Sequence, residues 1–186
     1  MKVGRDAPPY LFVDMAFVNP ETVFMSEDDS FLPVRKVLPH GVPMWVREGS
    51  VWFITICTAE RGTAVLTESD VAERLLNAAS FYHDRKRWYV HLFLIMPDHI
   101  HALITFGYEE KMSKLVAQWK SYTAKEAGIR WQQDFFDHRL RSNESMSEKA
   151  RYVRENPVRA GLVERGEDWP WQWEPPENEK MPPRIG

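Results

Sequence analysis

Two apolar runs that meet at a proline place the strongest constraint on the fold of this chain. The runs are Trp88–Met96 and His99–Phe106, and Pro97 stands at the bend between them. Both runs are rich in β-branched and aromatic residues, and a bend tolerates proline because no ladder hydrogen bond is lost there. The sequence therefore predicts an antiparallel hairpin. Side chains of a strand alternate between faces, so His99 and His101 are expected on one face. Two imidazoles placed in this way can hold a metal ion or lie beside a phosphate.

Further strands and helices are predicted on both sides of this hairpin. A β-branched and aromatic run predicts a strand at Val51–Cys57. Apolar residues at helical spacing predict a helix from Thr67 to about Asp84 and another over Lys111–Ala127, and a last strand is predicted within Ile129–Leu140. This order is that of a ferredoxin-like or RRM-like α+β fold, β-α-β-β-α-β. Such a fold is an antiparallel sheet with helices on one face and the other face open for a ligand.

One more helix is predicted C-terminal to the sheet. Ser145 and Glu148 have the spacing of a capping box, and Pro157 is expected to end the helix. Tyr152 and Asn156 are four residues apart, so they are neighbours on one helical face. This face lies away from the apolar stripe of the helix, which consists of Met146, Ala150 and Val153. Tyr152 is therefore not expected to be buried under its own helix.

The 186 residues are interpreted as one domain with extensions. Residues 1–34 are predicted to be an acidic N-terminal extension, residues 35–173 the domain with an ordered turn at Trp169–Trp173, and residues 174–186 a Pro-rich tail. Cys57 is the single cysteine, which excludes an intrachain disulfide and favours a reducing cytoplasm. No apolar run approaches the ~20 residues of a membrane-spanning helix, so a soluble protein without a membrane partner is expected.

Two motifs lie in the predicted hairpin and in the predicted C-terminal helix. The first is Met96-Pro-Asp-His-Ile-His101, and the second is Tyr152-Val-Arg-Glu-Asn-Pro-Val-Arg-Ala-Gly-Leu-Val163. Together they resemble the REP-associated tyrosine transposases, which are IS200-like, single-tyrosine members of the HUH endonuclease superfamily. The resemblance spans roughly residues 35–173 and includes Leu38-Pro-His40, Trp131-Gln132 and Phe136-Asp-His-Arg139. The acidic N-terminal segment lies outside the family pattern.

The resemblance implies a metal site and a nucleophile. His99 and His101 would bind a divalent metal ion, Asn156 would add its amide oxygen as a third ligand, and Tyr152 would be the nucleophile. Paired imidazoles alone favour zinc or a late transition metal, whereas the family favours Mg²⁺ or Mn²⁺. The implied activity is that of a metal-dependent single-stranded DNA endonuclease and strand transferase. It would cleave near palindromic repeat hairpins through a 5′-phosphotyrosine intermediate.

The resemblance further implies a partner, an assembly and a location. These are single-stranded or hairpin DNA, a monomer or a homodimer, and the bacterial cytoplasm at the nucleoid. The net charge is −3, but residues 111–165 carry 12 basic and 7 acidic side chains, which is compatible with a local phosphate-binding face. The candidate phosphate contacts are Lys120, Lys125, Arg139, Arg141, Lys149, Arg151, Arg154 and Arg159. For each of them a solvated surface charge is the alternative. Surface phenylalanines or tryptophans could stack bases.

Two other functions remain compatible with the residues alone. A catalytically inactive single-stranded nucleic-acid-binding protein could use the same sheet, its aromatic residues and its basic helix without a metal site. A metal-dependent hydrolase could use water as the nucleophile, with Tyr152 as a structural residue. The presence of Tyr152, His99 and His101 together argues against the inactive binding protein, whereas the hydrolase stays open.

Overall fold

The computed structural model describes residues 49–107, 111–141, 145–176 and 179. The chain divides into two units, Met1–Pro39 and His40–Gly186, and all described residues belong to the second. The predicted N-terminal extension and the motif Leu38-Pro-His40 lie outside the described residues. The domain limits predicted from the sequence therefore stay predictions.

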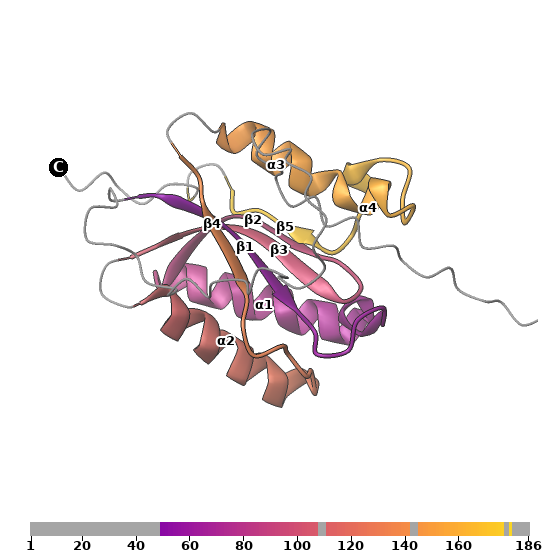
Figure 1. Ribbon diagram of the computed structural model, residues 1–186, viewed down its shortest axis with the longest axis horizontal. Helices are drawn as coiled ribbons and strands as arrows, with labels where there is room; N and C mark the ends of the chain where they lie inside the picture. Colours follow the sequence, from indigo (N-terminus) through magenta and orange to yellow (C-terminus); the bar gives the residue numbers. More distant parts are fainter. Residues whose placement is uncertain (1–48, 108–110, 142–144, 177–178, 180–186) are drawn as a thin grey trace, which may run out of the picture. The chain divides into compact units, whose positions relative to one another are not determined.

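The described residues form an antiparallel sheet of five strands in the order β4-β1-β3-β2-β5 (Figure 1). The predicted α+β class and the antiparallel sheet are confirmed, and the elements from β1 to β4 follow in the predicted order. The fifth strand lies where the sequence predicts only an ordered turn. The strands are β1 (Val51–Cys57), β2 (Trp88–Ile95), β3 (His99–Phe106), β4 (Phe136–Arg139) and β5 (Gln172–Trp173).

Helices lie on both faces of this sheet (Figure 1). On one face lie α1 (Ser69–Asp84) and α2 (Met112–Ala127), and on the other lie α3 (Met146–Arg154) and α4 (Asn156–Arg159). Two 3₁₀ helices, η1 (Val65–Thr67) and η2 (Gly166–Asp168), complete the set within the described residues.

The two expected helix ends near the predicted site have different outcomes. The Ser145 side chain accepts a hydrogen bond from the Glu148 amide, so the predicted N-cap of α3 is confirmed. The prediction for the other end holds only in part. α3 does end before Pro157, at Arg154, but Pro157 then lies in the first turn of α4, where proline costs no helical hydrogen bond.

The main core lies between the sheet and the α1/α2 layer. Alternate residues of β1 and β3, such as Ile54 and Ile104, point towards this layer and are fully buried. The helices contribute Leu75 of α1 and Trp119 of α2. Trp119 lies 6.1 Å from Trp88 between ring centroids, so aromatic rings join α2 to the start of β2.

A β-bulge changes which side chains of β2 face this core. The pairing register with β3 shifts between Val90 and Leu92, and the His91 ring makes a 2.9 Å hydrogen bond with Thr105 Oγ1. Because of this extra residue, Val90 and Phe93 both belong to the main core, although strict alternation would put them on opposite faces. Leu92 and Leu94 then face the other side of the sheet.

The second face of the sheet carries its own apolar cluster. Phe53, Leu92 and Leu103 of the sheet pack there with Ala150 and Val153 of α3. The helix that bears Tyr152 therefore packs against β3, the strand that bears the two histidines. The face expected to be open for a ligand is covered over β2 and β3 by the additional C-terminal helix that the sequence predicts. The apolar side chains of α3 need burial, and this face supplies it.

The C-terminal segment anchors α3 on this face. Arg154 at the end of α3 pairs with Glu174, with 2.8 Å from Nε to the carboxylate. The Trp169 indole donates a 2.8 Å hydrogen bond to the Ile95 carbonyl of β2. Gly166 lies so close to α3 that a Cβ there would meet the Arg154 carbonyl oxygen at 2.6 Å. The segment after α4 thus joins the helix to the edge of the sheet.

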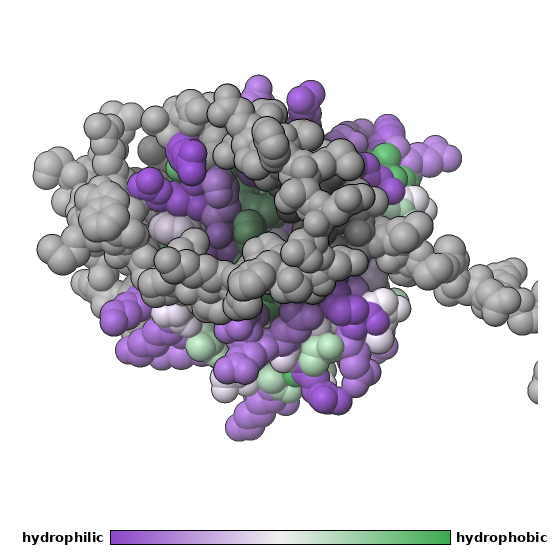
Figure 2. All heavy atoms as spheres, viewed as in Figure 1, coloured by the Kyte–Doolittle hydropathy of each residue, from purple (hydrophilic) through white to green (hydrophobic). Residues whose placement is uncertain are grey.

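No helix of the described part is long and apolar enough to cross a membrane. In the view of Figure 2 the described surface is mostly hydrophilic, with small, scattered apolar groups. The large apolar side chains that are exposed in the described residues are Phe81, Tyr122, Phe136, Met146 and Tyr152.

The close approach at Gly166 yields a stability prediction. Gly166→Ala should lower the free energy of unfolding by about 1–3 kcal/mol, because the new methyl group collides with backbone that cannot move aside. Gly107→Ala is the matched control, since a Cβ at Gly107 meets nothing within 4 Å. Urea unfolding measures both variants. Equal stability of the two would contradict the packing described for Gly166.

Candidate active site

His99 and His101 of β3 form a pair of imidazoles on the second face of the sheet. Their Nε2 atoms lie 3.2 Å apart, and the ring centroids lie 4.6 Å apart. Ile100, between them, points into the main core on the opposite face. Side chains alternate between the two faces along β3, so the two rings lie side by side, as the sequence predicts.

Each imidazole is held through its other ring nitrogen. His99 Nδ1 lies 2.7 Å from the Asp98 carboxylate, and His101 Nδ1 lies 2.9 Å from Thr55 Oγ1 of β1. Asp98 also accepts a 2.8 Å hydrogen bond from the Gly62 amide and lies 3.2 Å from Arg61 Nε. These contacts leave the two Nε2 atoms facing each other. A carboxylate or hydroxyl behind a ring nitrogen is the arrangement that orients metal-binding histidines.

The protonation of the pair follows from its surroundings. Partial burial raises the pKa of Asp98, but hydrogen bonds from His99 and Gly62 outweigh this effect and leave the pKa below its ordinary value. An ionised carboxylate only accepts, so His99 Nδ1 donates the proton of this hydrogen bond. Burial lowers the pKa of His101 well below its ordinary value, and nearby positive charges add to this effect. His101 is thus neutral at neutral pH.

The separation of the two Nε2 atoms fits a shared metal ion. Adjacent ligands of an octahedral ion with bonds of about 2.0–2.1 Å lie about 2.9 Å apart. Two ligands of a tetrahedral ion with the same bond length lie about 3.3 Å apart. The observed 3.2 Å lies between these values and suits both kinds of ion. Within the described residues no group of three or more His, Cys, Asp or Glu side chains forms a metal site, so the histidine pair would need ligands of another kind.

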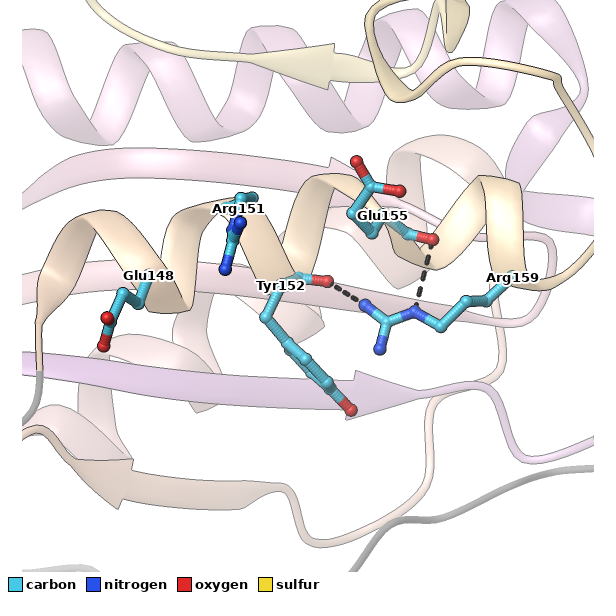
Figure 3. A pocket seen from close by; sticks show the side chains of 5 residues that line it. All are labelled: Glu148, Arg151, Tyr152, Glu155 and Arg159. Carbon is cyan, nitrogen blue, oxygen red and sulfur yellow. Dashed lines mark hydrogen bonds between the residues drawn. The ribbon is translucent and has the colours of Figure 1, made fainter.

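Tyr152 of α3 lies beside two cations and is 37% exposed, in agreement with the sequence prediction that it is not buried under its helix. The Arg159 guanidinium lies 4.1 Å from its ring centroid, and the Lys149 ammonium lies 5.4 Å from it. Arg159 reaches back from α4 and donates hydrogen bonds to the carbonyls of Tyr152 and Glu155 (Figure 3). Cation–π contacts of this kind contribute about 0.5–1 kcal/mol each at exposed sites.

Lys149 connects the tyrosine to the histidine pair. Its ammonium lies 5.4 Å from the Tyr152 ring and 5.0 Å from the ring of Phe53 on β1. The Phe53 ring in turn lies 5.3 Å from His101. Lys149 and Arg159 are both close enough to His101 to lower its pKa. The phenol, two cations and two imidazoles therefore share one region, which is the candidate active site.

A shallow hollow on α3 borders this region but does not include the histidines. Figure 3 shows the side chains that line it: Glu148, Arg151, Tyr152, Glu155 and Arg159. Two carboxylates accompany two guanidinium groups there, so the hollow has a mixed charge. The candidate active site is therefore defined by the contacts from Tyr152 to His101 and not by this hollow.

Asn156 stands where α3 passes into α4. Its amide nitrogen donates to the carbonyls of Tyr152 at 3.2 Å and Val153 at 3.0 Å. These bonds fix the direction of the side chain, and Oδ1 is its other polar atom. The predicted neighbourhood of Tyr152 and Asn156 is thus present at the junction of two helices and not on one continuous helix. The metal-binding role of Asn156 stays a prediction.

Residues 50–156, more than half of the chain, match the model of the family described as "Transposase IS200 like". The chain belongs to this family. The matched segment contains His99, His101, Tyr152 and Asn156. Membership of the IS200-like transposase family makes this a DNA-processing protein in general terms.

Individual relatives agree with the family and with the resemblance found in the sequence. A REP-associated tyrosine transposase of Escherichia coli (strain K12) is 25% identical over 128 residues, which cover 67% of this chain and 76% of the relative. A relative from Haemophilus influenzae is 27% identical over 142 residues, which cover 67% and 79%. A solved structure of a REP-associated tyrosine transposase bound to a REP hairpin has a TM-score of 0.59 at 22% identity, with 80% of this chain and 82% of that chain covered. At this identity the likeness shows a shared fold.

In this IS200-like protein, three of the predicted phosphate contacts lie around Tyr152. Lys149 and Arg159 touch its ring, and Arg151 lines the hollow beside it. The aromatic Phe53 and the polar Thr55 complete the surroundings of His101, although the sequence alone does not single them out. Their signal in the sequence is positional, because both belong to the same face of β1.

The other predicted contacts lie elsewhere. Lys125 belongs to α2, in the layer on the opposite side of the sheet, and Arg139 pairs with Trp52, whose side chain faces that layer. Arg154 is engaged by Glu174, and Arg141 is exposed just after β4. The structure corrects the prediction that Lys120 contacts phosphate, because its side chain is buried and does not belong to a phosphate-binding surface.

Lys120 holds the loop that leads to β4. Its ammonium donates to the carbonyls of Gln132 at 2.6 Å, Gln133 at 2.8 Å and Asp134 at 3.4 Å. Burial lowers the pKa of Lys120 below its ordinary value. The residue thus serves to position β4, the strand at the edge of the sheet next to β1.

We expect Lys120→Met to lower the free energy of unfolding by about 1–3 kcal/mol, because loop carbonyls lose their donor. Lys125→Met, on the exposed side of the same helix, is the control and should leave stability unchanged. Chemical unfolding of both variants provides the measurement. If Lys120→Met is as stable as the control, the buried ammonium does not hold the loop.

Proposed function

We propose that this protein is a metal-dependent single-stranded DNA endonuclease and strand transferase that acts through Tyr152. The observation that carries the proposal is the set of contacts that joins Tyr152, through Lys149 and Phe53, to the neutral His101. Membership of the IS200-like family supports the same chemistry. A solved structure of similar fold is that of a transposase bound to a REP hairpin, so hairpin DNA with a single-stranded flank is the partner that we propose.

In the proposed reaction the Tyr152 oxygen attacks phosphorus and displaces the 3′ oxygen of the preceding nucleotide. A bond forms between phosphorus and the phenolic oxygen, and the bond to the 3′ oxygen breaks. The phenol gives up its proton and the departing oxygen gains one, so the step is balanced. The product is a 5′-phosphotyrosine with a free 3′ hydroxyl, which can reverse the reaction without ATP.

Residues of this chain would position the phosphate and receive its charge. Lys149 and Arg159 both contact the ring of Tyr152 and would hold non-bridging oxygens as charge develops. His99, His101 and the Asn156 oxygen would hold a divalent ion. When bound, such an ion supplies polarisation of a phosphate oxygen. Asp98 and Thr55 would keep the imidazoles in the orientation seen here.

A covalent adduct tests this proposal. Incubation with labelled hairpin DNA, single-stranded flanks of varied sequence and Mn²⁺ should yield a protein–DNA adduct that survives denaturation. Tyr152→Phe should abolish the adduct, because the nucleophilic oxygen is removed. Tyr122→Phe is the control, since Tyr122 is also exposed but belongs to α2 on the other layer, and it should form the adduct normally.

Other outcomes of the same assay favour the alternatives. Cleavage that survives in Tyr152→Phe would show that water is the nucleophile. Binding without cleavage at any metal would indicate an inactive single-stranded DNA-binding protein. His99→Ala or His101→Ala should strongly reduce the adduct without preventing DNA binding.

The orientation of His99 by Asp98 leads to a prediction on metal affinity. Asp98→Asn should weaken Mn²⁺ binding by about 10–100-fold, because an amide orients the imidazole less well and makes it less basic than a carboxylate does. Asp84→Asn, at the exposed end of α1, is the control. Calorimetric titration with Mn²⁺ measures the affinity without DNA. Equal affinities of the two variants for Mn²⁺ would show that Asp98 does not support a metal site.

A further inference from the structure

Phe136 is a large apolar side chain at the edge of the sheet, and it is 50% exposed. It opens β4, which pairs only with β1 within the described residues. Its side chain is therefore partly open to solvent. A single exposed phenylalanine is common on protein surfaces, so its significance depends on what surrounds the ring.

The pairing of β4 with β1 puts Phe136 on the face of the histidine pair. Phe136 lies opposite Thr55, and directly paired residues of an antiparallel sheet point to the same face. Thr55 is the residue that holds His101. The ring of Phe136 also lies 6.2 Å from that of Phe53, edge to face. Phe136 is thus the outermost ring of a row that continues through Phe53 to His101.

This row lies beside positive charge. Lys149 contacts the ring of Phe53, and the positive charges of Lys149 and Arg159 both lie near enough to His101 to lower its pKa. The Phe136 ring lies no farther from the His101 ring than the two centroid separations together, about 11.5 Å. A single strand that binds its phosphate near the histidines can cover this distance with a few nucleotides. Aromatic rings next to basic side chains are the usual platform for unpaired bases.

We infer that Phe136 stacks an unpaired nucleobase of the DNA strand whose phosphate binds at the histidine pair. The inference rests on the proposed function, since it names a contact of the same strand. Phe53 supports the platform by its edge-to-face contact with Phe136, and Lys149 beside Phe53 would contact an adjacent phosphate. Lys120 contributes indirectly, because it holds the loop before β4.

The experiment compares two strands of equal length in the Tyr152→Phe background, which prevents covalent reaction. One probe is a labelled oligothymidine of about 15 nucleotides, and the other is the same sugar–phosphate backbone without bases. Phe136→Leu should weaken binding of the thymidine strand by about 5–100-fold and leave binding of the abasic strand unchanged. Phe136→Trp should bind the thymidine strand about as tightly as the parent, because it keeps an aromatic face.

Phe81→Leu is the matched control. Phe81 is 55% exposed and contacts a cation, Arg85, but lies on α1 in the layer on the opposite side of the sheet. This variant should bind both strands as the parent does. Equal binding of the thymidine strand by Phe136→Leu and the parent would overturn the inference. Equal loss for both strands would also overturn it, since Phe136 would then serve folding or the backbone.

The binding experiment and the adduct assay test different claims, so either claim can fail without the other. A parent that does not prefer the thymidine strand to the abasic strand would overturn the stacking role, while a Tyr152 adduct with hairpin DNA would still support the nuclease. Base-dependent binding through Phe136 without any adduct would support the platform as part of a DNA-binding protein and overturn the nuclease.

Discussion

The candidate active site depends on the apolar contact between α3 and the second face of the sheet. A helix of nine residues is marginal by itself in water, so its position comes from the surfaces that it buries. Ala150 and Val153 pack on Leu92 and Leu103, and the C-terminal segment holds the helix end at Arg154. Tyr152 is carried by the same helix. The placement of Tyr152 on the face of the sheet that carries the imidazoles is therefore a consequence of hydrophobic packing.

Electrostatics then give this region its chemical character. Two imidazoles lie close to two cations, and the depressed pKa of His101 follows from burial and from nearby positive charges. Protonation of His101 would add positive charge to a region that already holds Lys149 and Arg159. An incoming phosphate or metal–phosphate group brings the negative charge that such a region lacks. The carboxylate of Asp98 lies behind His99, on the side away from the facing Nε2 atoms.

The sequence predicted best where a local pattern decides the structure. β1 and β3 have the bounds expected from their β-branched residues and from the proline bend. α2 ends at Ala127, as predicted, and Gly128 caps it with a φ of +68°. Predictions were wrong where a distant contact decides. Lys120 looks like a surface lysine in a basic segment, but loop carbonyls from beyond α2 enclose it. The bulge at His91 is likewise invisible in a continuous apolar run.

By itself, the sequence determined the α+β order of elements, the shared face of His99 and His101, and the exposure of Tyr152, because strand alternation and helical spacing are local. Only the tertiary structure decided that α3 covers part of the second face and that Thr55 and Asp98 hold the imidazoles. It also decided that Phe136, on the edge strand β4, points to the face of the sheet that carries the histidines. These features depend on strand register and on burial between segments far apart in the chain, which no local pattern specifies.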